Sequence, residues 1–159
     1  MPPSDHSYKA WSFDPAVTPT LDGSLTPTSG VVYFWQFYNP TTVTISTVSW
    51  YVSTAGTTLT NAQIGVYDTG ASSALRGYAA LPGALGTGLK TYTLTAVGSL
   101  TLTPGVYAVA VVMTASTKPT IWGTNTGSPV GLANVNQATT ANQLTFRAGH
   151  VASGLSALP

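Results

Sequence analysis

Carboxylates and histidines are the residues to weigh first for chemistry, because they carry most acid–base and nucleophilic catalysis. The chain has no Glu, and its acidic residues are Asp5, Asp14, Asp22 and Asp68. Its histidines, His6 and His150, lie near opposite ends of the sequence. A Ser–His–Asp triad would have to join one of them to Asp5 or Asp14, and the chain lacks the Gly-x-Ser-x-Gly elbow of many hydrolases. We therefore expect two exposed loop histidines and no triad.

Metal and glycosidase sites are disfavoured by the spacing of the same carboxylates. A metal needs clustered ligands, whereas Asp68 stands alone and Asp22 has only Gly23 and Ser24 beside it. Calcium held by loop carbonyls with Asp68 stays open as an alternative. Glycoside hydrolysis needs two facing carboxylates, and the scattered aspartates offer no such pair. The sequence thus predicts a protein that is not an enzyme, with no metal and no cofactor.

Aromatic side chains are the more promising feature. The chain has eight tyrosines and four tryptophans, Trp11, Trp35, Trp50 and Trp122. Sugars stack on such rings while amides and carboxylates bind the hydroxyl groups. The candidate glycan-binding residues are Trp122, Asn125, Asp68 and Gln36. The alternative is that the rings are core or interface, and it is favoured for Trp35 and Trp50 because each sits in an apolar alternation.

The most apolar stretch is residues 31–38, with the sequence Val-Val-Tyr-Phe-Trp-Gln-Phe-Tyr. Successive side chains of a strand point to opposite faces. One face therefore holds Val31, Tyr33, Trp35 and Phe37, and the other holds Val32, Phe34, Gln36 and Tyr38. Because both faces are apolar, the strand is either central and covered twice, or its outer face meets a ligand or a second subunit. The candidate subunit contacts are Tyr33, Trp35 and Phe37, joined by Trp11 and Phe13, and part of residues 106–113 is a further candidate.

Composition supports an all-β class and excludes several partners. Charged residues make up 6% of the chain, against roughly 25% in typical proteins, and Thr, Gly, Ala, Val and Ser replace them. The five basic residues are scattered, so neither nucleic acid nor a membrane surface is an expected partner. There is no cysteine, and the N-terminus lacks the charged segment and apolar run of a signal peptide. So few charges favour permanent assembly, which hides sticky strand edges.

The order of strand and turn signals predicts an antiparallel two-sheet β-sandwich of jelly-roll type, with about eight or nine short strands. Residues 1–30 read as an extended Pro-rich arm, 31–148 as the sandwich and 149–159 as a flexible tail. Residues 106–113 are apolar on both faces and should pair with residues 31–38.

Local signals along the chain give further expectations. Pro104-Gly105 fits a type II turn closing a hairpin over residues 99–113. The alternation slips by one residue at Ser46–Thr47, which indicates a β-bulge or a strand break, and we expect a bulge. Residues 89–94 read as an edge strand, and 144–147 as the last strand.

Several segments resemble β-sandwich domains of tailed-bacteriophage structural proteins, notably minor tail and fibre proteins of phages infecting actinobacteria. They are residues 53–70, 87–95, the Leu-Thr-Pro-Gly-Val-Tyr-Ala-Val-Ala-Val run of 102–111, and 147–159. The resemblance spans residues 31–159 and rests on sequence rich in Thr, Gly and Ala.

The resemblance implies a structural component of a phage virion, made in the host cytoplasm and present in multiple copies. It implies self-association as a homotrimer and contact with other virion proteins. The position on the particle would be capsid decoration or a minor tail protein, and the lack of a coiled coil or other tail-attachment segment favours a small decoration or accessory subunit. The alternative is a receptor-recognition module of a tail or fibre that binds a host cell-surface glycan.

Overall fold

The computed structural model describes residues 23–69, 74–123, 148–152 and 157–158, and in these ranges the chain is all-β without a helix. Its strands are β1 (Gly23–Leu25), β2 (Val32–Asn39), β3 (Val43–Thr44), β4 (Thr47–Thr54), β5 (Gly56–Asp68), β6 (Leu75–Ala80), β7 (Ala84–Leu85), β8 (Gly88–Thr93), β9 (Thr95–Ala96), β10 (Thr101–Leu102), β11 (Gly105–Thr117), β12 (Thr120–Gly123) and β13 (Ala148–Ala152). The predicted all-β class is confirmed.

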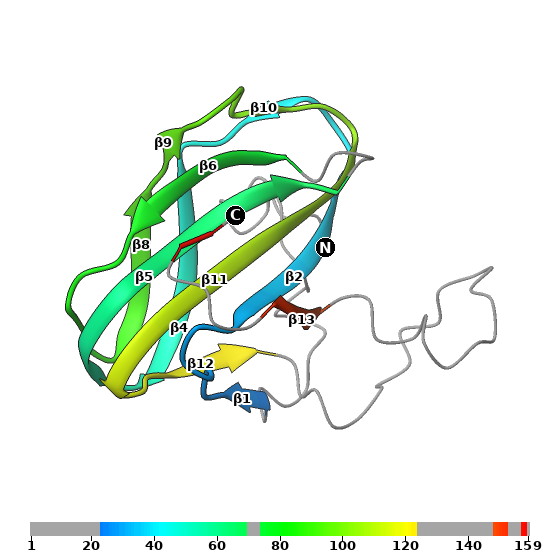
Figure 1. Cartoon of the computed structure of the whole chain (residues 1–159). Helices are drawn as coiled ribbons and strands as arrows, with labels where there is room; N and C mark the ends of the chain where they lie inside the picture. Colours follow the sequence, from blue (N-terminus) through cyan, green and yellow to red (C-terminus); the bar gives the residue numbers. More distant parts are fainter. Residues whose placement is uncertain (1–22, 70–73, 124–147, 153–156, 159) are drawn as a thin grey trace, which may run out of the picture.

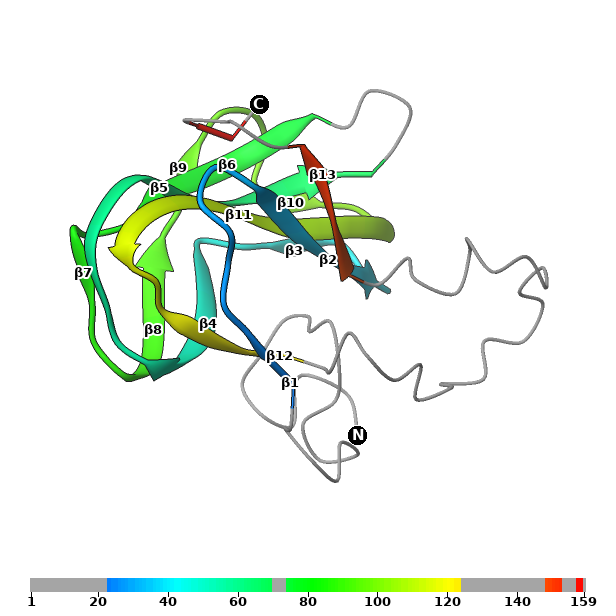
Figure 2. The same ribbon diagram turned by 60° about the horizontal axis from the view of Figure 1, so that its bottom comes forward.

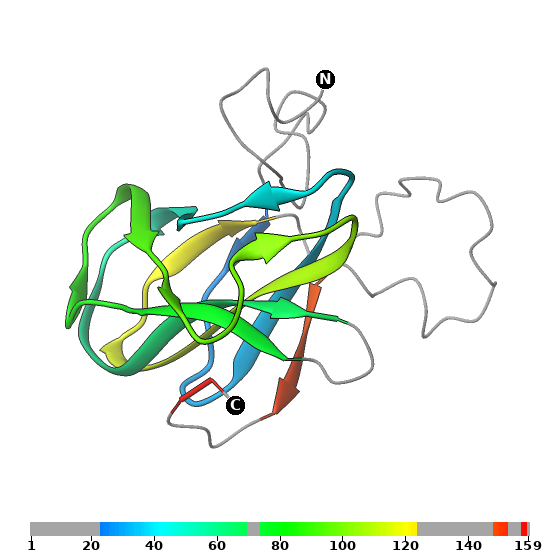
Figure 3. The ribbon, with the colours of Figure 1, turned by 90° about the horizontal axis from the view of Figure 1, so that it is seen from above.

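Two antiparallel sheets make up the body of the protein. The larger sheet has the order β13-β2-β11-β5-β6-β9, with β7 also paired to β5, and the smaller sheet has the order β1-β12-β4-β8. In Figure 1 the larger sheet lies in front of β4 and β8, and Figure 2 separates β5 and β11 from β4 and β12 as two layers. Seen from above, the same two layers enclose the interior (Figure 3). The β3–β10 pair forms a short ribbon beside them. This strand order leaves the jelly-roll topology a prediction.

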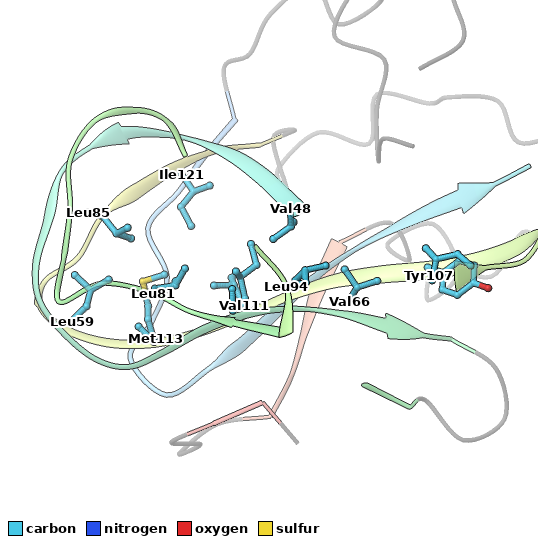
Figure 4. Packing of buried hydrophobic residues seen from close by; sticks show 14 residues of the cluster. Val48, Leu59, Val66, Leu81, Leu85, Leu94, Tyr107, Val111, Met113 and Ile121 are labelled. Atoms are coloured by element: carbon cyan, nitrogen blue, oxygen red, sulfur yellow. The ribbon is translucent and has the colours of Figure 1, made fainter. Parts of the chain in front are cut away.

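The main core fills the space between the two sheets. Figure 4 shows Val48 and Ile121 of the smaller sheet pointing toward Val66, Val111 and Met113 of the larger one. All five are buried, and Val111 is 0% exposed. The longest strands, β5 and β11, lie side by side at the centre of the larger sheet, so they supply much of this interior.

The predicted pairing of the two apolar stretches is confirmed. β11 runs antiparallel to β2, with Val106 opposite Tyr38 at one end and Val111 opposite Tyr33 at the other. β13 pairs with the other edge of β2, so β2 is an interior strand of its sheet. The predicted edge strand is also confirmed, because β8 ends the smaller sheet.

The expected bulge at Ser46–Thr47 was wrong, because the strand breaks there. β3 ends at Thr44 and pairs with β10, whereas β4 begins at Thr47 and pairs with β8. Two backbone bonds bridge the break, from the Ile45 N–H to the Leu100 carbonyl and from the Leu94 N–H to the Ser46 carbonyl. The slip in alternation therefore marks the point where the chain changes its pairing partner.

The expected hairpin at Pro104-Gly105 was also wrong. β10 pairs with β3, whereas β11 pairs with β2 and β5, so β10 and β11 do not form a hairpin with each other. Gly105 already belongs to β11 opposite Asn39, and among the described glycines only Gly30 and Gly88 have positive φ. A type II turn requires positive φ at its third residue, which Gly105 does not provide.

The flanks of the predicted sandwich contribute to both sheets where they are described. β1 pairs with β12 in the smaller sheet, and Pro27 is buried. β13 pairs with β2, and Leu158 is buried on the larger sheet. The division at residues 30/31 and 148/149 stays a prediction, and the strand expected at 144–147 lies outside the described residues.

A buried amide locks the corner between β2 and β3 to the turn before β11. Asn39 is 0% exposed, and its side-chain nitrogen donates to the carbonyls of Thr41, Leu102 and Thr103 at 2.6, 3.2 and 2.9 Å. The Tyr107 hydroxyl also donates to the Thr103 carbonyl, at 3.1 Å. These bonds hold the end of β10 and the turn after it against the end of β2, where no hairpin joins them.

We predict that Asn39→Ala lowers the free energy of unfolding by about 1–3 kcal/mol, since buried carbonyls lose their donor. Urea denaturation of the full chain measures this. Asn39→Asp should be at least as damaging, because a carboxylate keeps the size but presents no N–H to the carbonyls. The exposed neighbour Thr42 gives the control, Thr42→Ala, which should stay within about 0.5 kcal/mol of wild type. An Asn39→Ala protein as stable as that control would contradict the proposed lock.

Candidate functional site

The side of the larger sheet that faces away from the core is the most distinctive surface among the described residues. We call it the outer face. Strand alternation and the register of β2, β11, β5 and β6 place on it Val32, Phe34, Gln36, Tyr38, Val106, Ala108, Ala110, Val112, Gln63, Gly65, Tyr67 and Tyr78. None of these side chains is charged. Such a surface suits apolar or aromatic contact better than ionic recognition.

One end of the outer face is closed by the chain itself. Val32, Ala110 and Val112 are buried there together with Leu158, and Phe34, Tyr67 and Tyr78 pack around them. This second hydrophobic cluster lies on the opposite side of the sheet from the main core. β2 and β11 therefore pack on both faces, with one face toward the main core and the other toward this second cluster.

The other end of the outer face is open. Tyr38 and Val106 face each other across β2 and β11, and they are 63% and 45% exposed. Both rank among the most exposed large apolar side chains of the described chain. Side by side, a phenol ring and a branched aliphatic group form an apolar patch that the described residues leave in solvent.

Tyr67 lies between the two ends of the outer face. It is in register with Ala108 of β11, which is in turn opposite Gln36 of β2. Burial raises the pKa of Tyr67 to about 12 from its ordinary 10.0. The phenol therefore keeps its proton in the folded chain between about pH 10 and 12, where a free tyrosine loses it.

Asp68 sits at the end of β5, on the core-facing side of the sheet opposite Tyr107, and is paired with a cation. The Arg76 guanidinium contacts the Asp68 carboxylate at 2.5 Å, and both side chains are partly exposed. A register shift in β6 lies at this point, and the Asp68 N–H donates to the Ala74 carbonyl. Because the carboxylate is engaged by Arg76, it has less capacity to bind calcium or a sugar hydroxyl.

The four predicted glycan-binding residues fall in different places. Gln36 lies on the outer face, and Asp68 lies in the same sheet with β11 between the two strands. Trp122 belongs to β12 in the smaller sheet, where it is in register with Ser24. Asn125 lies outside the described residues. A glycan site shared by all four stays a prediction, and the structure brings only Gln36 and Asp68 into one sheet.

The predicted subunit contacts on β2 face inward. Tyr33, Trp35 and Phe37 pack against the main core, and the Phe37 ring stacks on Tyr107 at 5.9 Å. Trp11 and Phe13 lie outside the described residues, and a subunit contact by these five residues stays a prediction. Tyr38 is not among these five residues, and Val106 falls in the further candidate stretch 106–113. The alternation did separate the two faces, but it carries no signal for which of them is inward.

The smaller sheet carries a second aromatic pair on its core side. Trp50 and Tyr92 meet edge to face, with ring centroids 6.3 Å apart and an interplanar angle of 80°. The Trp50 N–H is buried without an acceptor in normal hydrogen-bond geometry. Burial raises the pKa of Tyr92, and the neighbouring Trp50 side chain offsets part of that rise. Trp50, like Trp35, packs against the core, so its ring serves packing.

The described residues hold no group of three or more His, Cys, Asp or Glu side chains that would suit a metal ion. In those same ranges no helix is long and apolar enough to cross a membrane. No protein-family model, curated protein or solved structure matches the chain.

We predict that Tyr67 makes the protein less stable as the pH rises from about 10 to about 12. Over this range the folded chain keeps the phenol proton while the unfolded chain loses it, so deprotonation favours unfolding. Urea midpoints measured across the range should fall steeply for wild type and less steeply for Tyr67→Phe. Thr42→Ala, which removes no titratable group from an exposed position, should keep the wild-type slope. If Tyr67→Phe and wild type lose stability in parallel, the proposed burial of this phenol is wrong.

Proposed function

We propose that this protein is a non-enzymatic structural subunit of a phage virion, a capsid decoration or minor tail protein present in multiple copies, that assembles through the open end of its outer face. The observation that carries the proposal is the exposed Tyr38–Val106 pair on an uncharged sheet face. Exposed apolar side chains that lie side by side on an uncharged face are candidates for a protein–protein contact. Assembly with further copies or other virion proteins covers it.

Scarcity of charge supports the same function. The charged side chains of the described ranges are Asp68, Arg76, Lys90 and Lys118, and the first two neutralise each other. Free β-proteins use charged side chains to keep their edges and faces apart. A subunit held permanently in a particle does not need this protection. The phage assignment and the trimeric order rest on the sequence resemblance, and the choice of contact surface rests on the outer face.

A second candidate function, recognition of a host cell-surface glycan, is favoured by one arrangement. Gln36 lies between Phe34 and Tyr38 on the outer face, and Tyr67 is in register with it across β11. Rings that stack on a sugar and an amide that binds its hydroxyls are thus on one face. This version of the glycan site uses Gln36 and replaces Trp122 with tyrosine and phenylalanine rings.

We predict that the purified chain is an oligomer at micromolar concentration and that Tyr38→Ser with Val106→Ser converts it to a folded monomer. Burying each large apolar side chain contributes about 1.5–3 kcal/mol, so losing two of them from every subunit weakens the contact strongly. Light scattering across a dilution series gives the mass. The matched control is Tyr51→Ser with Leu89→Ser, a pair opposite each other in the smaller sheet and 40% and 60% exposed.

The control pair should leave the mass unchanged. A wild-type protein that stays monomeric at all concentrations would refute assembly through this face. Dissociation by the control pair alone would move the contact to the smaller sheet.

For the glycan candidate, we predict that host cell-wall polysaccharide releases heat on binding and that Gln36→Ala reduces the affinity at least about tenfold, the loss of roughly one hydrogen-bonded group. Isothermal titration calorimetry measures it. Thr91→Ala, on the smaller sheet, should bind as wild type does. No heat at millimolar sugar eliminates this candidate and leaves the structural one standing.

A further inference from the structure

The last described residue of the chain is docked on the closed end of the outer face. Leu158 is 8% exposed and packs with Val32, Ala110 and Val112. In Figure 1 the C-terminal end lies in front of the larger sheet, and in Figure 2 it lies on the side away from the smaller sheet. The outer face is thus covered by Leu158 at one end and presents exposed apolar side chains at the other.

The place that Leu158 fills is shaped by a missing side chain. A Cβ on Gly65 would lie 2.8 Å from the Leu158 Cδ1 atom, closer than real Cβ contacts come. Gly65 is in the middle of β5 and its φ is not positive, so backbone conformation does not require glycine there. Glycine weakens a strand interior unless something approaches its backbone closely. Here the approaching groups are the Leu158 methyl and, each at 3.0 Å, the Gly77 carbonyl and the Leu75 methyl of the neighbouring strand.

A hydrogen bond fixes the backbone next to that side chain. The Leu158 N–H donates to Oε1 of Gln63 at 2.9 Å. Gln63 precedes Gly65 by two residues on β5, so its side chain stands on the same face. We call this arrangement the leucine socket, formed by Val32, Gln63, Gly65, Ala110 and Val112. The socket binds one backbone N–H and one branched aliphatic side chain. Main-chain hydrogen bonds and side-chain pockets are the two elements of extended-peptide recognition.

We propose that the leucine socket is a peptide-binding site, and that Leu158 occupies it as a detachable latch. Its ligand class is an extended peptide segment that presents a leucine with a free backbone N–H. The native occupant is Leu158 itself, which belongs to the same chain as the socket and so acts at a high effective concentration. The socket lies at the opposite end of β2 and β11 from Tyr38 and Val106, so it does not depend on the assembly proposed above.

The test uses the full chain with Leu158→Ala, which empties the socket, and a synthetic peptide with the sequence of residues 153–159. In ¹⁵N-labelled protein the peptide should shift the backbone amide signals of Gly65, Ala110 and Val112. Wild type should bind the same peptide at least about tenfold more weakly, because its own latch competes. A peptide with alanine in place of the second leucine should give no shifts. The absence of peptide-induced shifts in Leu158→Ala, or equal binding by wild type, would overturn the proposal.

A second measurement keeps the proposal testable if Leu158→Ala does not fold. Hydrogen exchange at the Leu158 amide of the wild-type chain should be slowed by its bond to Gln63, and Gln63→Met should abolish that protection. Gln63→Glu keeps an acceptor oxygen and should retain it. The matched tail control is Leu155→Ala, which should leave the protection at Leu158 unchanged. An unprotected Leu158 amide in wild type, or loss of protection in Leu155→Ala, would contradict a specific socket.

Discussion

The pairing of β2 with β11 is the contact on which the rest of this structure depends. Both strands are apolar on both sides, so their pairing creates two hydrophobic surfaces at once. The inner surface, with Tyr33, Trp35 and Phe37, joins the main core between the sheets. Exposing the outer surface to water costs free energy, and Leu158 covers one end of it. The exposed Tyr38–Val106 patch and the leucine socket both lie on this outer side.

Much of the fold could be predicted from the sequence, because long apolar strands carry a strong signal. The runs at residues 31–38 and 106–113 are too apolar to face water, so they had to lie together at the centre of a sheet, as they do. Alternation also separated the faces of β2 correctly. It did not tell which face is inward, because that depends on where the smaller sheet lies. The contacts predicted on β2 lie on the face with Trp35, which packs inside, whereas Tyr38 lies on the opposite face.

The two wrong local predictions have a common physical cause. The bulge expected at Ser46–Thr47 and the hairpin turn expected at Pro104-Gly105 both rest on neighbours in sequence. In both places the chain instead changes pairing partner, and bonds between distant residues decide the outcome. The Asn39 amide shows this most clearly, since it holds carbonyls more than 60 residues away in sequence. Turn propensity is weak beside three hydrogen bonds made by a fully buried side-chain amide.

The two ends of the outer face show how a chain with few charges manages apolar surface. At the closed end, Gly65 gives up the packing of a side chain so that Leu158 can reach the sheet, and Gln63 orients the arriving backbone. At the open end, Tyr38 and Val106 have no comparable cover among the described residues. A sequence evolved only for a stable monomer gains by placing a polar group at either exposed position, since neither side chain is needed by the main core. Two exposed apolar side chains are understandable at the open end if that end contacts another molecule. The closed end shows that this fold can cover such apolar surface with its own residues.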